Sequence, residues 1–184
     1  MTLTKTPICN FGEKAIDFNL KSTENEKISL NEIKGKNGTL IMFICNHCPY
    51  VKAVIKDIVE DVNFLEKLGI RSAAIMSNDI KNYPEDSFEN MISFSKDNSL
   101  SFPYLIDETQ KVAKEYGAVC TPDFFGYNKN LELQYRGRIR ELRDLKAVRK
   151  GNSDLKNAMK LVAETGKGPK NQIPSMGCNI KWFK

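Results

Sequence analysis

Thr39-Leu40-Ile41-Met42-Phe43-Ile44-Cys45-Asn46-His47-Cys48-Pro49 is the stretch that decides the fold. Its first six residues form a continuous apolar run, which is typical of a strand covered on both faces in the middle of a parallel or mixed sheet. Pro49 has a fixed φ and lacks an N–H, so it suits the first turn of a helix. The stretch therefore predicts a strand that ends at Cys45 and a helix that begins just after Cys48.

The residues after Pro49 predict a long amphipathic helix followed at once by another strand. Apolar side chains recur at helical spacing until Gly69 ends the pattern, at Val51, Val54, Ile55, Ile58, Val62, Leu65 and Leu68. Residues 70–76 are again mostly apolar. Strand, helix and strand then form a βαβ unit with a right-handed crossover, and Cys45 and Cys48 lie at its strand-to-helix turn.

The remainder of the chain predicts further elements around that unit. Residues 12–20 alternate apolar and polar side chains and, with residues 28–30, predict an N-terminal hairpin. Later patterns favour a helix near residues 88–94, a strand at 102–106, a helix at 109–116 after an Asp107 N-cap, strands at 123–127 and 131–135, and a helix at 153–164. We expect one domain over residues 1–165 and an irregular tail, residues 166–184, packed on it.

Composition favours a single globular domain. The chain has 184 residues, of which 41% are hydrophobic and 28% are charged, and a domain of this length buries about 70% of the surface that its unfolded chain exposes. The first residues lack the apolar core of a secretory signal, and no apolar run approaches the ~20 residues that span a bilayer. We therefore expect a cytoplasmic protein with no membrane partner.

The net charge of +5 is distributed unevenly along the chain. Residues 129–184 hold 14 Lys and Arg against 5 Asp and Glu, whereas residues 1–128 hold 14 against 18. The basic third lacks the interleaved aromatic residues and the motif spacings of nucleic-acid-binding proteins. A solvated basic face explains this charge better than a nucleic acid partner.

Five cysteines are an odd number, which favours reactive or incidental thiols over a fixed disulfide framework. A cysteine where a strand meets a helix lies beside unpaired N–H groups and the positive end of the helix dipole, and both favour its thiolate. The C-x-x-C spacing of Cys45 and Cys48 lets the two sulfurs form a disulfide. We predict that Cys45 is the exposed nucleophile, with a lowered pKa, and that Cys48 is the resolving thiol.

His47 is the only histidine in the chain and lies between the two cysteines. A protonated or hydrogen-bonding imidazole there would stabilise the Cys45 thiolate and make the disulfide more oxidising. The alternative is that His47 caps the turn and points to solvent.

A C-x-x-C motif is also half of a zinc site. The second half is missing, so zinc would have to recruit Cys120 or Cys178 without another paired motif, and copper would find a single imidazole. We therefore expect neither a metal nor a cofactor, and a non-enzymatic metal carrier or redox-regulated binding module stays as an alternative.

Thr121-Pro122 lies between an expected helix and an expected strand. The proline is either an ordinary turn residue or part of a cis X-Pro bond. In the cis case the backbone of Thr121 would be presented to a partner's extended chain.

Taken in order, the strand, the C-x-x-C turn, the helix and the Thr-Pro before a hairpin resemble the thioredoxin superfamily. More narrowly, the chain resembles the peroxiredoxin-like redoxins, relatives of the alkyl hydroperoxide reductase and thiol-specific antioxidant proteins. It is similar to an uncharacterised branch of that group at Cys45–Pro49, at Cys120–Asp123 and at Gly177-Cys178-Asn179-Ile180-Lys181-Trp182.

This resemblance implies a fold and the surroundings of the dithiol. The fold is a thioredoxin-like three-layer α/β sandwich, with a central mixed sheet flanked by helices and an N-terminal β-hairpin extension. Pro122 is expected to be cis and to face the C-x-x-C turn, so that Cys120 and Thr121 lie beside the site.

One departure from the resemblance bears on mechanism. In peroxiredoxins the peroxidatic cysteine would fall at Cys48, with a threonine where this chain has Cys45 and a proline where it has Ile41. The threonine that orients peroxide is therefore absent. The arginine of a peroxide pocket would have to be Arg136, Arg138 or Arg140.

Two further thiols are candidates for the site. Cys120 is either a second resolving thiol or a small buried apolar residue. Cys178 is either a resolving thiol or a structural residue of the tail. We expect Cys9 to be incidental.

The leading hypothesis is an enzyme, a thiol-disulfide oxidoreductase that uses Cys45 and Cys48 with His47, Thr121 and Pro122 around them. Its partners would be a disulfide-containing protein or a small-molecule thiol substrate, and an external thiol electron donor. The alternative enzyme is a peroxiredoxin-like antioxidant, a thiol-dependent peroxidase that reduces a peroxide substrate at Cys48.

Overall fold

The computed structural model describes residues 2–184, so residue 1, where the sequence places the start of the domain, lies outside the described residues. The strands are β1 (Leu3–Lys5), β2 (Asn19–Ser22), β3 (Lys27–Ser29), β4 (Gly38–Phe43), β5 (Ile70–Met76), β6 (Tyr104–Ile106), β7 (Cys120–Thr121), β8 (Asp123–Asn128), β9 (Leu133–Tyr135), β10 (Leu142–Arg143), β11 (Lys146–Ala147) and β12 (Met176–Asn179). The α-helices are α1 (Pro49–Glu66), α2 (Phe88–Asp97), α3 (Lys111–Tyr116) and α4 (Asp154–Thr165), and Pro84–Asp86 form a 3₁₀ turn.

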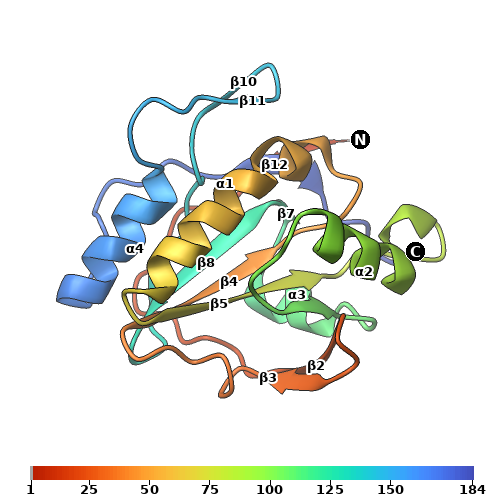
Figure 1. Ribbon diagram of the computed structural model, residues 1–184, viewed down its shortest axis with the longest axis horizontal. Helices are drawn as coiled ribbons and strands as arrows, with labels where there is room; N and C mark the ends of the chain where they lie inside the picture. The colour runs from red at the N-terminus through yellow and green to blue at the C-terminus, as the bar shows by residue number, and fades with distance from the viewer. Residues whose placement is uncertain (1) are drawn as a thin grey trace.

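The central sheet is mixed, and β4 lies inside it as its apolar run predicts. The strand order is β3-β2-β6-β5-β4-β8-β9. Strand β4 pairs in parallel with β5 and antiparallel with β8, and β5 pairs in parallel with β6. The βαβ unit predicted from residues 39–76 is confirmed, with α1 as its crossover (Figure 1).

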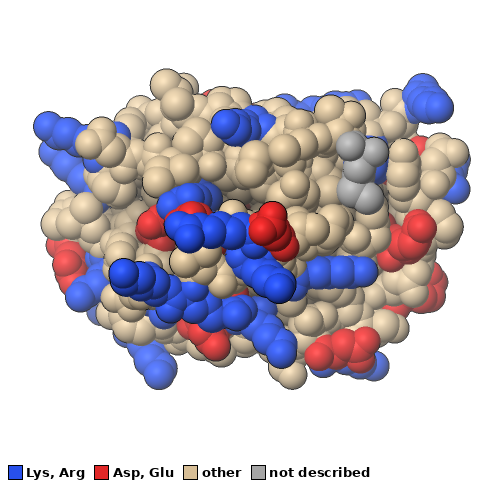
Figure 2. Space-filling model, turned by 90° about the horizontal axis from the view of Figure 1, so that it is seen from above, with Lys and Arg blue, Asp and Glu red and all other residues tan. Residues whose placement is uncertain are grey.

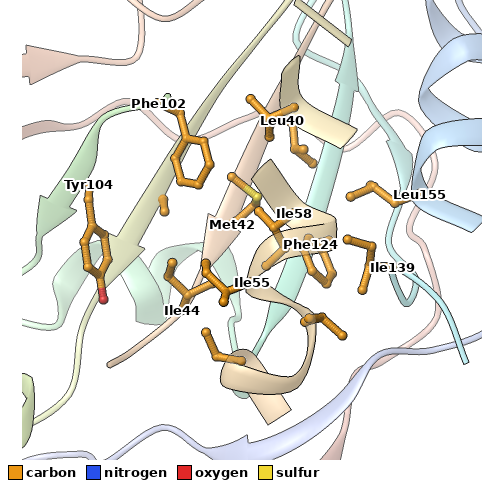
Figure 3. Close-up of a cluster of buried hydrophobic side chains, with 14 of the residues drawn as sticks. Leu40, Met42, Ile44, Ile55, Ile58, Phe102, Tyr104, Phe124, Ile139 and Leu155 are labelled. Carbon is orange, nitrogen blue, oxygen red and sulfur yellow. The ribbon is translucent and has the colours of Figure 1, made fainter. Parts of the chain in front are cut away.

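Side chains of β4 alternate between two cores on opposite faces of the sheet. Leu40 and Met42 pack among residues of α1 and α4, as Figure 3 shows, whereas Ile41 and Phe43 pack among residues of α3. Helices therefore cover both faces, and the predicted three-layer α/β sandwich is confirmed. The arrangement leaves the end of β4 and the start of α1 at one end of the sheet (Figure 1).

Two local predictions differ from the structure. The N-terminal hairpin exists, but its first strand is only Asn19–Ser22, and it joins the edge of the central sheet because β2 also pairs with β6. Asp107 does not cap a helix at residue 109, because α3 begins later, at Lys111. The Asp107 carboxylate instead accepts hydrogen bonds from the Ala113 N–H (2.9 Å) and the Ser77 hydroxyl (3.1 Å).

The tail is not irregular throughout, as the sequence suggested. Its strand β12 lies between β1 and β7 in a second, antiparallel sheet, with Cys178 opposite both Leu3 and Thr121. Gly177 allows this pairing, because a Cβ there would lie 1.9 Å from the Thr121 carbonyl oxygen. Sequence patterns miss such a strand because its four residues carry no alternation and its partners are distant along the chain.

The basic third of the chain is less solvated than predicted. Buried arginines from this region pair with buried carboxylates of the first two-thirds, Arg136 with Asp123 (3.0 Å) and Arg140 with Asp57 (3.0 Å). Figure 2 shows Lys and Arg gathered on one face with Asp and Glu among them. Among residues 2–184, no helix has both the length and the apolar character needed to cross a membrane.

Candidate active site

The dithiol turn connects the central strand to the longest helix. Strand β4 ends at Phe43, and Cys48 is the N-cap residue of α1, in an extended conformation with no side-chain cap. The Cys48 carbonyl accepts the hydrogen bond of Lys52 N–H at 3.0 Å. Cys48 therefore stands at the positive end of an 18-residue helix, where the dipole favours an anion.

The sulfurs of this turn are buried, so the prediction of an exposed Cys45 was wrong. Cys45 is 1% exposed and Cys48 is 0% exposed. The Cys45 Sγ lies 3.4 Å from the Thr121 hydroxyl, and the Cys48 Sγ lies 3.1 Å from the Thr121 carbonyl oxygen. Thr121 from the neighbouring loop therefore contacts both thiols, which the sequence spacing alone does not reveal.

The Thr121-Pro122 peptide bond is cis, as the resemblance implied. The backbone of Thr121, however, pairs with Cys178 in β12. The structure thus differs from the prediction that Thr121 is presented to a partner's extended chain: this chain's own tail occupies that place.

His47 is held by a buried aspartate that the sequence analysis missed. His47 Nδ1 lies 2.7 Å from a carboxylate oxygen of Asp86 and 4.0 Å from the Cys45 sulfur. Asp86 also accepts hydrogen bonds from the backbone N–H of Asn46 (2.8 Å) and from the Asn78 amide (2.8 Å). No pattern marks Asp86 in the sequence, because it lies in a 3₁₀ turn 38 residues after Cys48.

The ion pair shifts both of its members toward their charged forms. The hydrogen bond to Asp86 raises the pKa of His47, against the opposing effect of partial burial. Burial alone would raise the pKa of Asp86, but the hydrogen bonds from His47 and Asn78 lower it. A protonated imidazole beside Cys45 is therefore favoured, and His47 does not simply point to solvent.

The pKa values of the two sulfurs in the dithiol shift in opposite directions. The hydrogen bond with Cys48, burial and the Asp86 charge all raise the pKa of Cys45. The hydrogen bond from Cys45 lowers the pKa of Cys48 to about 5, and Cys178 contributes further hydrogen bonds. The thiol with the lowered pKa is therefore Cys48, not Cys45 as the sequence predicted, chiefly because of the hydrogen bond that Cys45 donates to it.

The other three thiols differ in their surroundings, and one of them contacts the dithiol. The Cys178 Sγ lies 3.0 Å from the Cys48 Sγ. Cys120 is buried and directs its sulfur to the Pro122 carbonyl (3.7 Å), and burial raises its pKa strongly. Cys9 is half-buried, and burial raises its pKa to about 11.

Cys45, His47 and Asp86 are the residues that could hold a metal ion. Their ligand atoms all lie within 4.8 Å of one another, and a sulfur, nitrogen and oxygen set suits zinc. Both oxygens of Asp86, however, already accept hydrogen bonds from Asn46, Asn78 and His47. This carboxylate is therefore arranged to bind the imidazole rather than a cation.

An open pocket of about 370 Å³ lies against the site and is lined by Thr2, His47, Tyr83, Glu85, Asn179 and Lys181. The His47 ring stacks on Tyr83, with ring centroids 5.9 Å apart. A second pocket, of about 240 Å³, adjoins Pro122 and has apolar walls that include Val54, Ile139 and Met176. The first pocket is the one that His47 lines.

The three arginines proposed for a peroxide pocket have partners elsewhere. Arg136 pairs with Asp123, Arg138 with Asp154 (2.6 Å) and Arg140 with Asp57. Burial raises the pKa of Asp123 to about 6, although the Arg136 guanidinium opposes the shift.

The fold and the dithiol at the helix N-terminus define a protein of the thioredoxin-fold class. The structure of the thioredoxin domain of a thiol-disulfide oxidoreductase from Bacteroides vulgatus superposes with a TM-score of 0.59 at 16% identity, covering 72% of this chain and 89% of that one. This likeness concerns the fold alone.

Residues 11–142 match the AhpC/TSA family, and the chain belongs to that family. An uncharacterized conserved protein from Geobacillus kaustophilus is similar over 100% of this chain and 97% of its own, with a TM-score of 0.93 and 38% identity. The thiol-disulfide oxidoreductase ResA of Halalkalibacterium halodurans is 27% identical over 122 residues, which are 66% of this chain. The match spans 65% of the length of that relative.

Proposed function

We propose that this protein is a thiol-disulfide oxidoreductase whose redox pair is Cys45 and Cys48. The observation that carries the proposal is the pair of buried sulfurs of Cys45 and Cys48 at the N-terminus of α1, which both contact Thr121. The similarity to ResA supports the same chemistry. A disulfide-containing protein or small molecule is the proposed substrate, and an external thiol is the proposed electron donor.

We assign the first attack to Cys45, which lies beside His47 and hence beside the pocket. Its proton passes to Cys48 across the hydrogen bond that joins the two sulfurs. The Cys45 thiolate then attacks the substrate disulfide, forming a mixed disulfide and releasing one substrate thiolate. His47, protonated through its pairing with Asp86, is placed to give that leaving group a proton.

Cys48 is suited to the second step. The Cys48 sulfur attacks the Cys45 sulfur of the mixed disulfide, and the proton that Cys48 received from Cys45 goes to the departing substrate sulfur. The bond to the substrate breaks, the second substrate thiol leaves, and a Cys45–Cys48 disulfide forms. Both sulfurs contact Thr121, so Cys48 is close to the Cys45 sulfur when the mixed disulfide has formed.

Reduction of insulin disulfides with an excess of a dithiol donor tests the proposal. We expect turnover by the wild type and none by Cys45→Ser. Cys48→Ser should accumulate a mixed disulfide at Cys45, visible as a mass increase in the intact protein. A Cys9→Ser control should match the wild type. Full activity of Cys45→Ser would contradict the assignment of Cys45.

A second candidate, a thiol peroxidase and antioxidant, is favoured by the lowered pKa of Cys48, which occupies the peroxidatic position of the family. The burial of Cys48 and the pairing of the three arginines weigh against it. Stopped-flow mixing with hydrogen peroxide separates the two functions, because a peroxidase forms a sulfenic acid at Cys48 rapidly. Slow oxidation of all five cysteines alike would eliminate the peroxidase.

We also propose a cytoplasmic location. Its support is the odd number of cysteines, none of which forms a disulfide among residues 2–184. Cell fractionation with antibodies to the protein tests the proposal, and recovery from an oxidising compartment would contradict it.

A further inference from the structure

The tail strand β12 brings a third sulfur against the dithiol. The Cys178 Sγ lies 3.0 Å from the Cys48 Sγ, which is closer than two unbonded sulfurs approach without a specific interaction. Cys178 is 3% exposed. Three buried thiols, Cys45, Cys48 and Cys178, therefore form one continuous group with Cys48 in the middle.

The position of Cys178 is built into the fold. Gly177 lets β12 approach the Thr121 carbonyl, and the register places Cys178 directly opposite Thr121, the residue that contacts both sulfurs of the dithiol. Residues on either side hold the strand. Asn179 N–H donates to the Thr2 carbonyl (3.1 Å) and Ile180 N–H to the Val119 carbonyl (3.2 Å).

The residues after β12 are also fixed to the loops around the site. Lys181 N–H donates to the Asn78 amide oxygen (2.8 Å), and Asn78 in turn donates to Asp86. Phe183 N–H donates to the Gln110 amide oxygen (2.8 Å). The tail thus shares a hydrogen-bond network with the His47–Asp86 pair, so its approach to Cys48 is specified on both sides.

We propose that Cys178 is a second resolving thiol. It replaces Cys45 as the disulfide partner of Cys48, so that the oxidised protein carries a Cys48–Cys178 disulfide. The proposal rests on the proposed function, because substrate turnover supplies the Cys45–Cys48 disulfide. The Cys178 sulfur attacks the Cys48 sulfur; the new S–S bond forms and the Cys45–Cys48 bond breaks. Cys45 leaves as a thiolate and receives the proton that Cys178 loses, so no further oxidant is consumed.

The exchange needs the proton of Cys178 to move to Cys45, because the thiolate is the attacking form. Burial and the hydrogen bond to Cys48 raise the pKa of Cys178 to about 12, so it carries its proton at rest. Cys45 also has a raised pKa and readily takes that proton. The exchange therefore moves the disulfide inward and returns Cys45, the thiol beside the pocket, to its reduced form.

Disulfide mapping tests the inference with the full chain. The protein is treated with one equivalent of 2-hydroxyethyl disulfide, quenched in acid, alkylated and digested with trypsin. Residues 37–52 contain Cys45 and Cys48 in one peptide, and residues 171–181 contain Cys178 in another. A Cys45–Cys48 disulfide therefore stays within one peptide, whereas a disulfide to Cys178 links two.

We expect the linked peptide pair in the wild type, and its loss in Cys45→Ser, which cannot form the first disulfide, in Cys48→Ser and in Cys178→Ala. Cys120→Ser is the matched control, because Cys120 is equally buried on the neighbouring strand, and it should give the linked pair at the wild-type yield. Oxidised wild type should also retain alkylatable Cys45, which Cys178→Ala should lose.

Two results would overturn the inference, and they are distinguishable. If the wild type forms only the disulfide within residues 37–52, the Cys178 proposal is wrong while the proposed function stands. If the wild type loses no thiols at all, the proposed function fails together with the inference.

Discussion

Two buried aspartates near α1 differ in the kind of side chain with which they pair. Asp57, on the helix itself, pairs with Arg140 (3.0 Å) and Arg149 (2.9 Å), whereas Asp86, beside the N-terminal end of the helix, pairs with His47 (2.7 Å). Arginine is permanently charged, so the first group has one charge state. Histidine titrates near neutral pH, so the second group has two. Burial of a carboxylate alone therefore does not indicate a functional site. Asp86 is distinguished by its partner, a histidine that titrates and lies beside the dithiol.

The largest effect in this comparison should come from Asp57→Asn. The substitution leaves the buried guanidinium of Arg140 without its carboxylate, and loss of one partner from a buried pair costs about 3 kcal/mol, roughly a hundredfold in the ratio of folded to unfolded protein. Urea denaturation measures this change. Glu60→Gln, at an exposed position of the same helix, is the control and should change stability by less than ~0.5 kcal/mol.

The titration of His47 and the insulin assay should not respond to Asp57→Asn in the folded protein. A changed pKa of His47 in this variant would show that the two aspartates are coupled and would undo the contrast between them.

A smaller effect is expected from Cys48→Ser. The alkylation rate of Cys45 at neutral pH should rise on the order of tenfold for each unit by which the pKa of Cys45 falls. The hydrogen bond with Cys48 is the largest cause of the raised pKa of Cys45. Its replacement should lower that pKa, so Cys45 should react faster with iodoacetamide at pH 7 than in the wild type. The measurement is the pH dependence of Cys45 alkylation, followed by mass spectrometry.

The pH dependence of Cys45 alkylation in the wild type also has an expected direction. Because the pKa of Cys45 is raised, its alkylation rate should increase with pH through the neutral range. The ultraviolet absorbance of one thiolate should persist until the pH falls to about 5, and Cys48→Ser should lack it. If Cys45 in the wild type still reacts rapidly below neutral pH, its pKa is lowered, as the sequence analysis predicted, and the assignment of the lowered pKa to Cys48 is wrong.

The smallest effect should follow Asp86→Asn, which removes the main cause of the raised pKa of His47. The pKa of His47, followed by NMR titration of its ring protons, should fall. In the wild type the folded pKa lies above the unfolded one, so the pairing stabilises the fold fully below the unfolded pKa and its contribution is lost as the pH rises through the folded value. Asp86→Asn should flatten this dependence, and an unaltered His47 titration would refute the pairing.

The fold was predictable from residues 39–76 because its signals are local. A six-residue apolar run, a proline at a helix start and a 3.6-residue period are each read from neighbouring positions. The same holds for the C-x-x-C spacing, which identified both sulfurs. The cis state of Pro122 followed from the resemblance, since the local sequence is equally compatible with an ordinary turn.

The surroundings of the sulfurs were not predictable in this way. Asp86 reaches His47 from a short 3₁₀ turn that lies 39 positions further along the chain. Cys178 reaches Cys48 across 130 positions, through a strand pairing that Gly177 permits. Both contacts determine which sulfur is charged. The wrong assignment of the thiolate to Cys45 therefore came from applying the helix dipole alone, without the carboxylate and the thiol that the tertiary fold adds.

The placement of β12 between β1 and β7 has a consequence during biosynthesis. The ribosome makes the dithiol turn well over a hundred residues before it makes residues 176–179, and at 5–20 residues per second the delay is several seconds or more. During that interval a nascent chain contains Cys45 and Cys48 but not yet Cys178, the third thiol of the group. Under the resolving role proposed for Cys178, the group of three thiols is complete only when β12 has been made.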